Sequence, residues 1–443
     1  MHRVRSLTLD NLSNEVASLL ALPAPQLEEL ELPFGLEGRY MIPTPFLANN
    51  APCLKRLTVA ESIDFPWDSP VLDHLVELTI DRSTSQMRAC AFPAPNAFFN
   101  LIGRLDRIQV LRLRNCLPIM PHVTLDPRIA LPTLKHFELE GTSEQCSNVL
   151  ERIEFDLQAR FFLTCREHHF GHERMFNELY RHFRGDSRML PVRTLAVSYS
   201  SEQVHHLDDR AVLAFRAWNT SCVDKEEEEK EKEKDLGNAA EPDFYQDLEG
   251  AETKLPDVRM TFAMKTWFVE QESYRLCALV PYDALRVLSM DVRGTRLNPE
   301  SIRRVSWPLE HVLDMFWSVP KLAHLRLGGN GDVDSRQAAQ FFRGMRERGT
   351  DEPARLEMFP DLKTLTLVDV STCFSCHGEA LFDILQHMLR LRKLDDMPIG
   401  TVYVKERRYE DQEWAKWKEL EDTKVVFRRE VKFVEEGCKW VQF

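Results

Sequence analysis

The segment LVELTI, residues 75–80, shows the pattern that decides the fold of this chain. Apolar side chains occupy its first, fourth and sixth positions, and the last two alternate with polar residues, as a β-strand with one buried face requires. The same six-residue phrase, apolar-x-x-apolar-x-apolar, occurs ten times along the chain: VRSLTL (4–9), LEELEL (27–32), LKRLTV (54–59), LVELTI (75–80), IQVLRL (108–113), LKHFEL (134–139), VRTLAV (192–197), LRVLSM (285–290), LAHLRL (322–327) and LKTLTL (362–367).

The spacing of the phrases indicates a repeat architecture. The first six copies lie 21 to 33 residues apart, close to the period of ~20–29 residues typical of leucine-rich repeats. Other gaps hold a strand-like segment, ARFFLTC (159–165), and amphipathic helical patterns, PNAFFNLIGRLD (95–106), PLEHVLDMFWSV (308–319) and EALFDILQHMLRL (379–391). We therefore expect an α/β fold, an irregular leucine-rich repeat solenoid with a parallel β-sheet on its concave side and helices and loops on its convex side.

The charge distribution suggests how the 443 residues are divided. Of the formal net charge of −13, residues 224–254 supply −8, from 13 acidic and 5 basic side chains, with few large apolar groups to offset the entropy of ordering. We expect four parts: the N-terminal part of the solenoid (1–223), an acidic disordered insertion (224–254), the C-terminal part of the solenoid (255–400) and a C-terminal cap of a helix and short strands (401–443). An acidic recognition element is the alternative interpretation of the insertion.

Composition argues against several classes of protein. With 70 acidic and 57 basic side chains the surface repels phosphate, so nucleic acid is not an expected partner. No apolar run reaches the ~20 residues that span a bilayer, and the start MHRVRSLTLDN has no apolar stretch typical of a secretory signal. The ten cysteines are scattered, as in a reduced protein. We expect no membrane association and a location in the cytoplasm or nucleus.

Motifs that would carry chemistry are weak. CFSCH (373–377) matches the pattern for haem attachment, but it directly follows a strand phrase where a turn is needed. CREHHFGH (165–172) places His168 and His172 at a metal-binding spacing, but Gly171 weakens a helix there. No nucleophile elbow, phosphate loop or dinucleotide fingerprint is found. We expect no catalytic residue, no cofactor and no metal site, and keep an enzyme or metal-binding protein as the third alternative.

The remaining candidates are the side chains between the buried positions of each phrase, which we expect to point outward from the concave face of the sheet. Their charge sign changes along the face, as suits a protein partner with complementary charges. A solvated sheet without a partner is the alternative. The candidate partner-binding residues are Glu29, Glu31, Arg56, Glu77, Asp81, Arg112, Arg114, His136, Glu138, His324 and Arg326.

One segment resembles a known family. LPTLKHFELEGTSEQCSNVLERIEFDLQARFFLTC (131–165) is similar to the leucine-rich region of the F-box protein family of mushroom-forming (basidiomycete) fungi, in which a leucine-rich strand leads through a turn into a short helix and a strand ending near a cysteine. LPAPQLEELELPFG (22–35), NAPCLKRLTV (50–59) and FPDLKTLTL (359–367) resemble the same family's strand beginnings.

The resemblance implies a role as the substrate-recognition part of a cullin-type ubiquitin ligase. In such proteins an N-terminal F-box binds a Skp-type adaptor, and the repeats select the substrate. The chain begins inside its first repeat, so we expect a Skp-type adaptor as partner only if an F-box precedes these residues. We predict a monomeric, non-enzymatic protein-interaction module whose partner is a protein. A leucine-rich repeat scaffold or adaptor unrelated to ubiquitin is the alternative.

Overall fold

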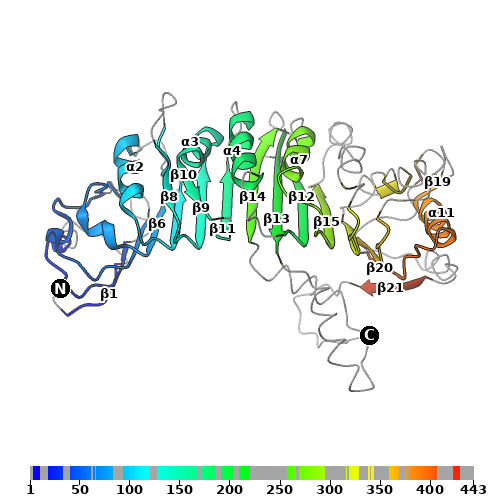
Figure 1. The fold of residues 1–443 in the computed structure, drawn as a ribbon, viewed down its shortest axis with the longest axis horizontal. Coiled ribbons are helices and arrows are strands. Elements are labelled where there is room, and N and C mark those ends of the chain that lie inside the picture. Colours follow the sequence, from blue (N-terminus) through cyan, green and yellow to red (C-terminus); the bar gives the residue numbers. More distant parts are fainter. Residues whose placement is uncertain are drawn as a thin grey trace, which may run out of the picture. The chain divides into compact units, whose positions relative to one another are not determined.

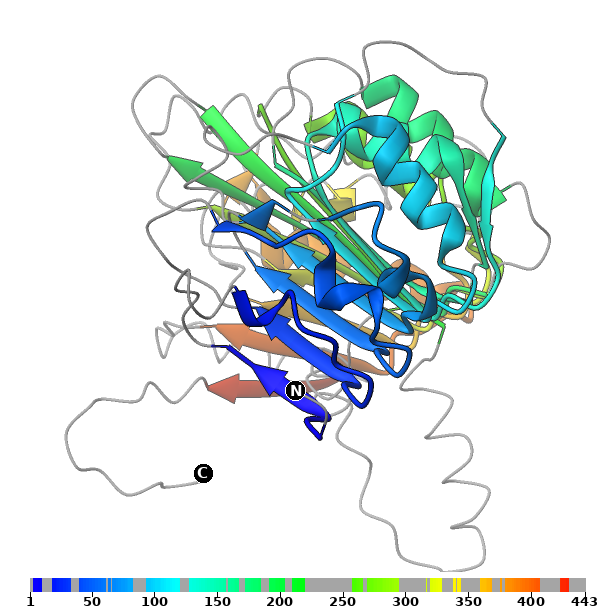
Figure 2. The same ribbon diagram turned by 90° about the vertical axis from the view of Figure 1, so that its left-hand side faces the viewer.

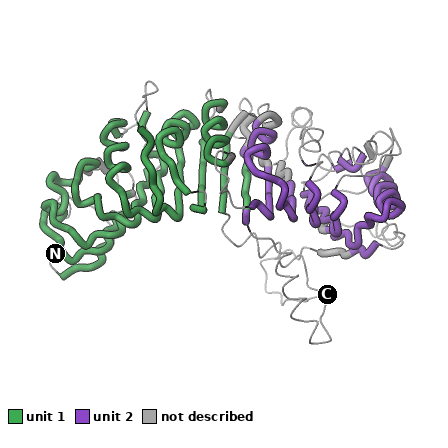
Figure 3. Tube along the Cα trace, in the orientation of Figure 1, with its two compact units in different colours: residues 1–190, 214–217, 254–264 green, residues 191–213, 218–253, 265–443 purple. Residues whose placement is uncertain are grey.

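The chain forms a mixed α/β structure with a large, mostly parallel sheet and few helices, which agrees with the expected α/β class. It divides into two compact units, shown in Figure 3: unit 1 comprises residues 1–190, 214–217 and 254–264, and unit 2 comprises residues 191–213, 218–253 and 265–443. The computed structural model describes residues 3–9, 18–32, 40–60, 63–64, 66–82, 93–119, 127–156, 158–166, 172–184, 191–203, 209–219, 257–265, 269–294, 316, 319–328, 338–339, 341–343, 359–368, 375–376, 379–406 and 423–429.

All ten predicted strand phrases form strands, and each strand begins at the third position of its phrase. The segment 159–165 also forms the additional strand expected there, as β11. The strands of unit 1 are parallel and follow one another in the order β1 (Ser6–Thr8), β2 (Glu29–Leu32), β4 (Arg56–Ala60), β6 (Glu77–Asp81), β7 (Val110–Arg114), β9 (His136–Gly141), β11 (Arg160–Cys165) and β14 (Val258–Lys265) (Figure 1).

The register of the sheet keeps equivalent positions of the phrase side by side. The fourth positions form one continuous row of apolar side chains across unit 1, and most of its members are fully buried. The sixth positions form a second buried row beside it. A shift of one residue would turn both rows to the opposite face of the sheet, so the apolar pattern fixes the register. The first of these rows consists of Leu7, Leu30, Leu57, Leu78, Leu111, Phe137, Phe161 and Val258.

The backbone at the start of each strand repeats the same hydrogen bonds. The carbonyl at the second position of one phrase accepts the N–H groups at the second and third positions of the next, as Glu28 O does from Lys55 and Arg56. The N–H group at the first position donates to the carbonyl three residues earlier, as Leu75 does to Leu72. Both arrangements recur in unit 1 and in unit 2, so the phrase encodes a turn as well as a strand.

Three helices lie on one side of the strands of unit 1: α2 (Pro95–Arg104), α3 (Ser143–Arg152) and α4 (His172–Arg184) (Figure 2). The predicted helix 95–106 is confirmed as α2, which begins at a proline and buries Phe98 and Ile102. Helix α3 starts at a capping box in which the Thr142 hydroxyl accepts from the Gln145 N–H and the Gln145 amide oxygen accepts from the Thr142 N–H. Helix α4 was not predicted from the sequence.

Unit 2 repeats the parallel arrangement. Its strands follow the order β12 (Thr194–Gln203), β15 (Val287–Gly294), β16 (His324–Gly328), β17 (Thr364–Val368), β20 (Thr401–Glu406) and β21 (Lys424–Arg429). Its described helices are α7 (Val269–Cys277) and α11 (Leu381–Leu394), the second of which confirms the helix predicted at 379–391. Strand β13 (Asp209–Trp218) contributes residues to both units.

A buried arginine anchors α11. Arg392 is fully buried, and its guanidinium donates to the carbonyl oxygen of Phe359 at 2.8 Å and to that of Met397 at 3.1 Å. Phe359 precedes β17 and Met397 precedes β20, so a single side chain ties the helix to two loops. Burial lowers the pKa of Arg392 to about 10, which leaves the group charged at neutral pH.

Short elements complete the described structure. Three two-stranded pairs lie outside the main sheet, and two 3-10 helices precede strands of unit 1. These are β3 (Tyr40–Met41) with β5 (Ile63–Asp64), β8 (Ile129–Leu131) with β10 (Ile153–Phe155), β18 (Ser375–Cys376) with β19 (Glu379–Ala380), η1 (Phe46–Asn49) and η2 (Pro70–His74). The acidic insertion, the helical pattern expected in the C-terminal cap and nearly all of the predicted helix 308–319 lie outside the described residues.

Candidate functional site

The polar side chains of unit 1 converge on one carboxylate. We use the name polar sheet face for the side chains at the third, fifth and seventh positions of the phrases, which alternate with the buried rows. At the fifth position, the register places Arg112 of β7 beside Glu138 of β9, followed by Phe162 of β11 and Arg259 of β14. At the seventh position, Arg114 lies next to Asp81.

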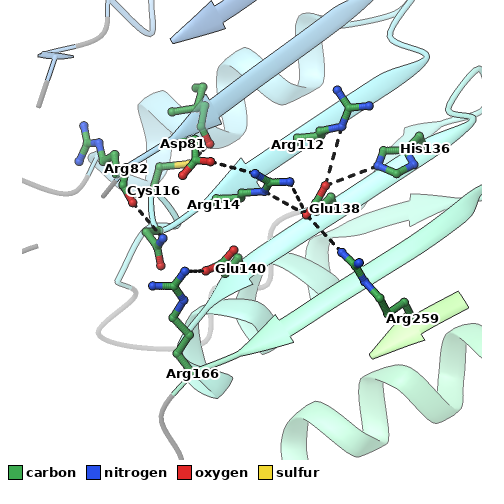
Figure 4. Close-up of polar contacts among 12 residues, drawn as sticks. Asp81, Arg82, Arg112, Arg114, Cys116, His136, Glu138, Glu140, Arg166 and Arg259 are labelled. Carbon is green, nitrogen blue, oxygen red and sulfur yellow. Dashed lines mark hydrogen bonds and ion pairs between the residues drawn. The ribbon is translucent and has the colours of Figure 1, made fainter. Parts of the chain in front are cut away.

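Glu138 is the centre of this group, which we call the Glu138 cluster: Asp81, Arg112, Arg114, His136, Glu138 and Arg259 (Figure 4). The residue is only 5 % exposed, although it is charged. The Nε of Arg114 donates to its Oε1 at 3.0 Å, and the Nη2 of Arg114 forms an ion pair with the same oxygen at 2.9 Å. The Nη1 of Arg114 donates to Asp81 Oδ2 at 2.9 Å, so one guanidinium joins two carboxylates on neighbouring strands.

Two further arginines approach Glu138 less closely. Arg112 Nε lies 3.8 Å from Oε2, and Arg259 Nη2 lies 3.8 Å from Oε1. Both distances exceed a hydrogen bond, and both arginine side chains are more than one third exposed. The guanidinium of Arg259 stacks over the ring of Phe162, 4.4 Å from its centre, and the ring of His136 meets the same phenylalanine edge-on at 4.8 Å.

The electrostatics of the cluster favour the ionised carboxylate. Burial acts to raise the pKa of Glu138, but the nearby His136 and the hydrogen bond and charge of Arg114 outweigh it, so the pKa lies below the ordinary value for glutamate. Burial likewise acts to lower the pKa of Arg114, and the contacts with Asp81 and Glu138 raise it above its usual value. Glu138 therefore stays charged at neutral pH and holds the arginines around it.

Residues beside the cluster fix the ends of its strands. Glu140 forms an ion pair with Arg166, which follows β11. After β7, the Asn115 amide donates to the carbonyl of Arg82 at 2.9 Å, and the Cys116 thiol donates to that of Ile80 at 3.9 Å. Burial raises the pKa of the Cys116 thiol to about 12, so it stays protonated.

The structure groups the predicted site residues unequally. It brings together Asp81, Arg112, Arg114, His136 and Glu138, all on β6, β7 and β9. Glu138 lies on the polar sheet face, where it was expected, but its carboxylate is covered by the arginines and by His136.

The other predicted residues of unit 1 lie away from the cluster. Glu29 and Arg56 form an exposed ion pair between β2 and β4. Glu31 accepts from the Thr8 hydroxyl at 3.4 Å, and Glu77 lies half-buried next to Arg56 in the register.

The two predicted residues of unit 2 form a separate set of contacts. His324 is buried and contacts the hydroxyl of Thr364, and Arg326 donates to the Ser289 hydroxyl at 3.1 Å. Burial, reinforced by the charges of Lys363 and Arg286, lowers the pKa of His324 to about 3. This histidine is therefore neutral at physiological pH.

Sequence reasoning missed Arg259, because β14 carries no leucine phrase. The signal was nevertheless present in VRMTFAMK (258–265), where apolar residues alternate with others as in a half-buried strand. The position of β14 beside β11 could not be inferred, because more than ninety residues separate the two strands along the chain.

Neither metal-site motif gains support from the structure. Across the described ranges, no group of three or more histidine, cysteine, aspartate or glutamate side chains is arranged to hold a metal ion. Cys165 is buried with its sulfur 3.3 Å from that of Met175, and His168 and most of CFSCH lie outside the described residues. In the same ranges, no helix is both long enough and apolar enough to cross a bilayer.

The fold and the site together define a mixed α/β protein whose large, mostly parallel sheet carries a cluster of arginines around a buried carboxylate. No protein-family model matches the chain. No curated protein matches it in sequence.

Proposed function

We propose that the chain is an irregular leucine-rich repeat solenoid that acts as a non-enzymatic protein-interaction module. The observation that carries this proposal is the polar sheet face of unit 1, where charged and half-exposed side chains stand in register on successive parallel strands. The repeated phrase, the repeated turn hydrogen bonds and the in-register buried rows support the solenoid. The helices of unit 1 lie on one side of its strands (Figure 2), and in the proposed solenoid the polar sheet face would be the concave surface.

The chemistry of this face suits a protein partner. It offers half-buried guanidinium groups next to carboxylates, so that positive and negative charges alternate on neighbouring strands, and such a pattern gives specificity and orientation to an association. The acidic character of the whole chain disfavours nucleic acid.

Site-specific photocrosslinking tests the interaction role. A photoreactive amino acid placed at Thr58 or Thr79, on the polar sheet face, should form a crosslink to a discrete partner in cells that express the protein. The same amino acid at Asn100, exposed on α2, is the matched control and should form none. Equal crosslinking from both sides, or none from the polar sheet face, would contradict the proposal.

A role in ubiquitin transfer is the more specific form of the proposal and is supported by the resemblance of residues 131–165. It predicts that the protein purified from its native cells carries a Skp-type adaptor and a cullin. Crosslinked partners without either of these would favour a leucine-rich repeat scaffold or adaptor outside ubiquitin chemistry. We further propose that the protein is a monomer in the cytoplasm or nucleus, which light scattering and cell fractionation test.

A further inference from the structure

We propose that the Glu138 cluster is the docking point for an acidic segment of a protein partner, with Arg112 and Arg259 as the residues that bind its carboxylates. This inference rests on the proposed interaction role and names the chemistry of the partner at one place on the polar sheet face. It is supported by the unused hydrogen-bond donors of these two arginines, by the local charge of the cluster and by the fixed positions of the side chains.

In the described structure, the guanidinium groups of Arg112 and Arg259 keep hydrogen-bond donors that Glu138 does not use. A guanidinium has five N–H donors. Arg114 uses its Nε, Nη1 and Nη2 on Glu138 and Asp81. Within the described structure, Arg112 and Arg259 meet Glu138 only at 3.8 Å, too far for a hydrogen bond. Their side chains are 37 % and 36 % exposed, so an incoming group can reach these donors.

The Glu138 cluster carries a local excess of positive charge. Three arginines face two carboxylates, so three positive charges against two negative ones leave a surplus of one. This surplus stands on a chain whose net charge is −13. Because charges separated by more than ~10 Å are screened at physiological salt, a short acidic segment responds mainly to the local surplus, whereas a long polyanion also meets the negative remainder.

The side chains of Arg112 and Arg259 are already positioned for binding in the free protein. Glu138 draws Arg112 and Arg259 toward one point from two different strands, and the ring of Phe162 supports Arg259 from below. Side chains that are already held lose less conformational entropy on binding. A planar guanidinium binds a carboxylate through two parallel hydrogen bonds, which lysine cannot do. Glu138 thus acts as an internal placeholder: it is a carboxylate of the chain itself that holds these arginines where the partner's carboxylates would bind.

Fluorescence anisotropy with a labelled oligoglutamate peptide at low salt is the direct test. The full chain should bind this peptide and not its oligoglutamine counterpart. The double variant Arg112→Gln/Arg259→Gln should bind about ten-fold or more weakly, because it lacks the guanidinium donors that would form charged hydrogen bonds with the peptide. Arg5→Gln/Arg107→Gln removes the same charge from exposed positions of the same unit that lie outside the polar sheet face, and should bind within about two-fold of the parent chain.

A variant with the opposite expected effect separates binding from structure. Glu138→Gln removes the placeholder and should bind oligoglutamate more tightly, while its unfolding transition moves to lower urea. Circular dichroism on each variant checks that the fold is retained. Unchanged affinity in both Glu138→Gln and Arg112→Gln/Arg259→Gln would show that the cluster only holds the strands together, and would overturn the proposal.

Two further arms complete the test. A single-stranded oligonucleotide of equal charge that binds as tightly as the peptide would indicate general attraction to polyanions and would overturn the assignment to an acidic protein. Photocrosslinking from Thr79 in Arg112→Gln/Arg259→Gln separates the two proposals. A crosslink as strong as in the parent chain contradicts the acidic docking point and leaves the interaction role standing, and a lost crosslink supports the docking point.

Discussion

At the scale of single residues, two buried glutamates have pKa values that are shifted in opposite directions. Glu138 in unit 1 is surrounded by arginines and His136, and its pKa is lowered. Glu272 on α7 is 2 % exposed, with Arg275 at 3.5 Å as its only charged contact in the described residues, and burial raises its pKa to about 7. The charged partners determine the pKa of Glu138, whereas burial determines the pKa of Glu272.

The lowered pKa of Glu138 predicts a loss of stability in acid. A group whose pKa is lower in the folded chain stabilises the fold above its unfolded pKa, and this contribution disappears as the pH falls through the folded pKa. We expect Glu138→Gln to cost about 1–3 kcal/mol at neutral pH and progressively less below about pH 4.5. Urea unfolding across this range measures the difference. A cost that is constant with pH would contradict the prediction.

Glu272 predicts the reverse dependence. Because its folded pKa of about 7 lies above the ordinary value of 4.5, the favourable contribution is present in acid and is lost as the pH rises through about 7. Glu272→Gln should therefore leave stability near that of the parent chain at about pH 5 and increase it at about pH 8.5, by on the order of 3 kcal/mol. Thermal or urea unfolding at the two pH values checks both expectations. Glu151→Gln is the control, because Glu151 is half-buried and ion-paired.

At the scale of elements, the sequence phrase predicts strands well and their neighbours less well. All ten phrases form strands, because the buried fourth and sixth positions specify both the face and the register. The residues that were predicted on the polar side of the same strands include five of the six members of the Glu138 cluster. Strands β13 and β14 were missed because they lack the phrase, and helices α4 and α7 were also missed. Arg259 was missed because the pairing of β11 with β14 depends on the packing of a distant segment.

Helix α11 offers a direct test of an element held by one polar side chain. Arg392→Met would leave the Met397 carbonyl without its arginine donor, which costs ~1–3 kcal/mol. It would leave the Phe359 carbonyl with the Leu362 N–H as its remaining donor in the described structure. We expect a loss of more than about 2 kcal/mol in the free energy of unfolding. Arg390→Met, two residues away and exposed, should change stability by less than about 0.5 kcal/mol. Equal effects of the two substitutions would show that these hydrogen bonds contribute little.

At the scale of the whole molecule, each unit is built from contacts between neighbouring strands rather than around one centre. The phrases of unit 1 pair with their neighbours in the sheet, and the buried row continues from strand to strand. In such an array, stability is approximately a sum of terms within each repeat and between adjacent repeats. A local defect should therefore have local consequences.

Leu111→Ala tests this behaviour in unit 1. The side chain is fully buried, so the substitution should cost about 2–5 kcal/mol. Hydrogen exchange should become faster in β6, β7 and β9 and stay close to that of the parent chain in β1 and β2. Val110→Ala, half-buried on the same strand, should have a much smaller effect. Uniform loosening of the whole unit would indicate a single cooperative core instead.

The repeated backbone hydrogen bonds at the strand starts have a consequence for how this surface can change. Because carbonyl and N–H groups of the main chain link each phrase to the next, the side chains at the third and fifth positions are not needed to align the strands. Substitutions at the exposed members of these positions can alter what is recognised while the framework stays in place. A protein built in this way can acquire a new partner one residue at a time, and the same freedom makes its polar sheet face a surface on which binding specificity can be engineered.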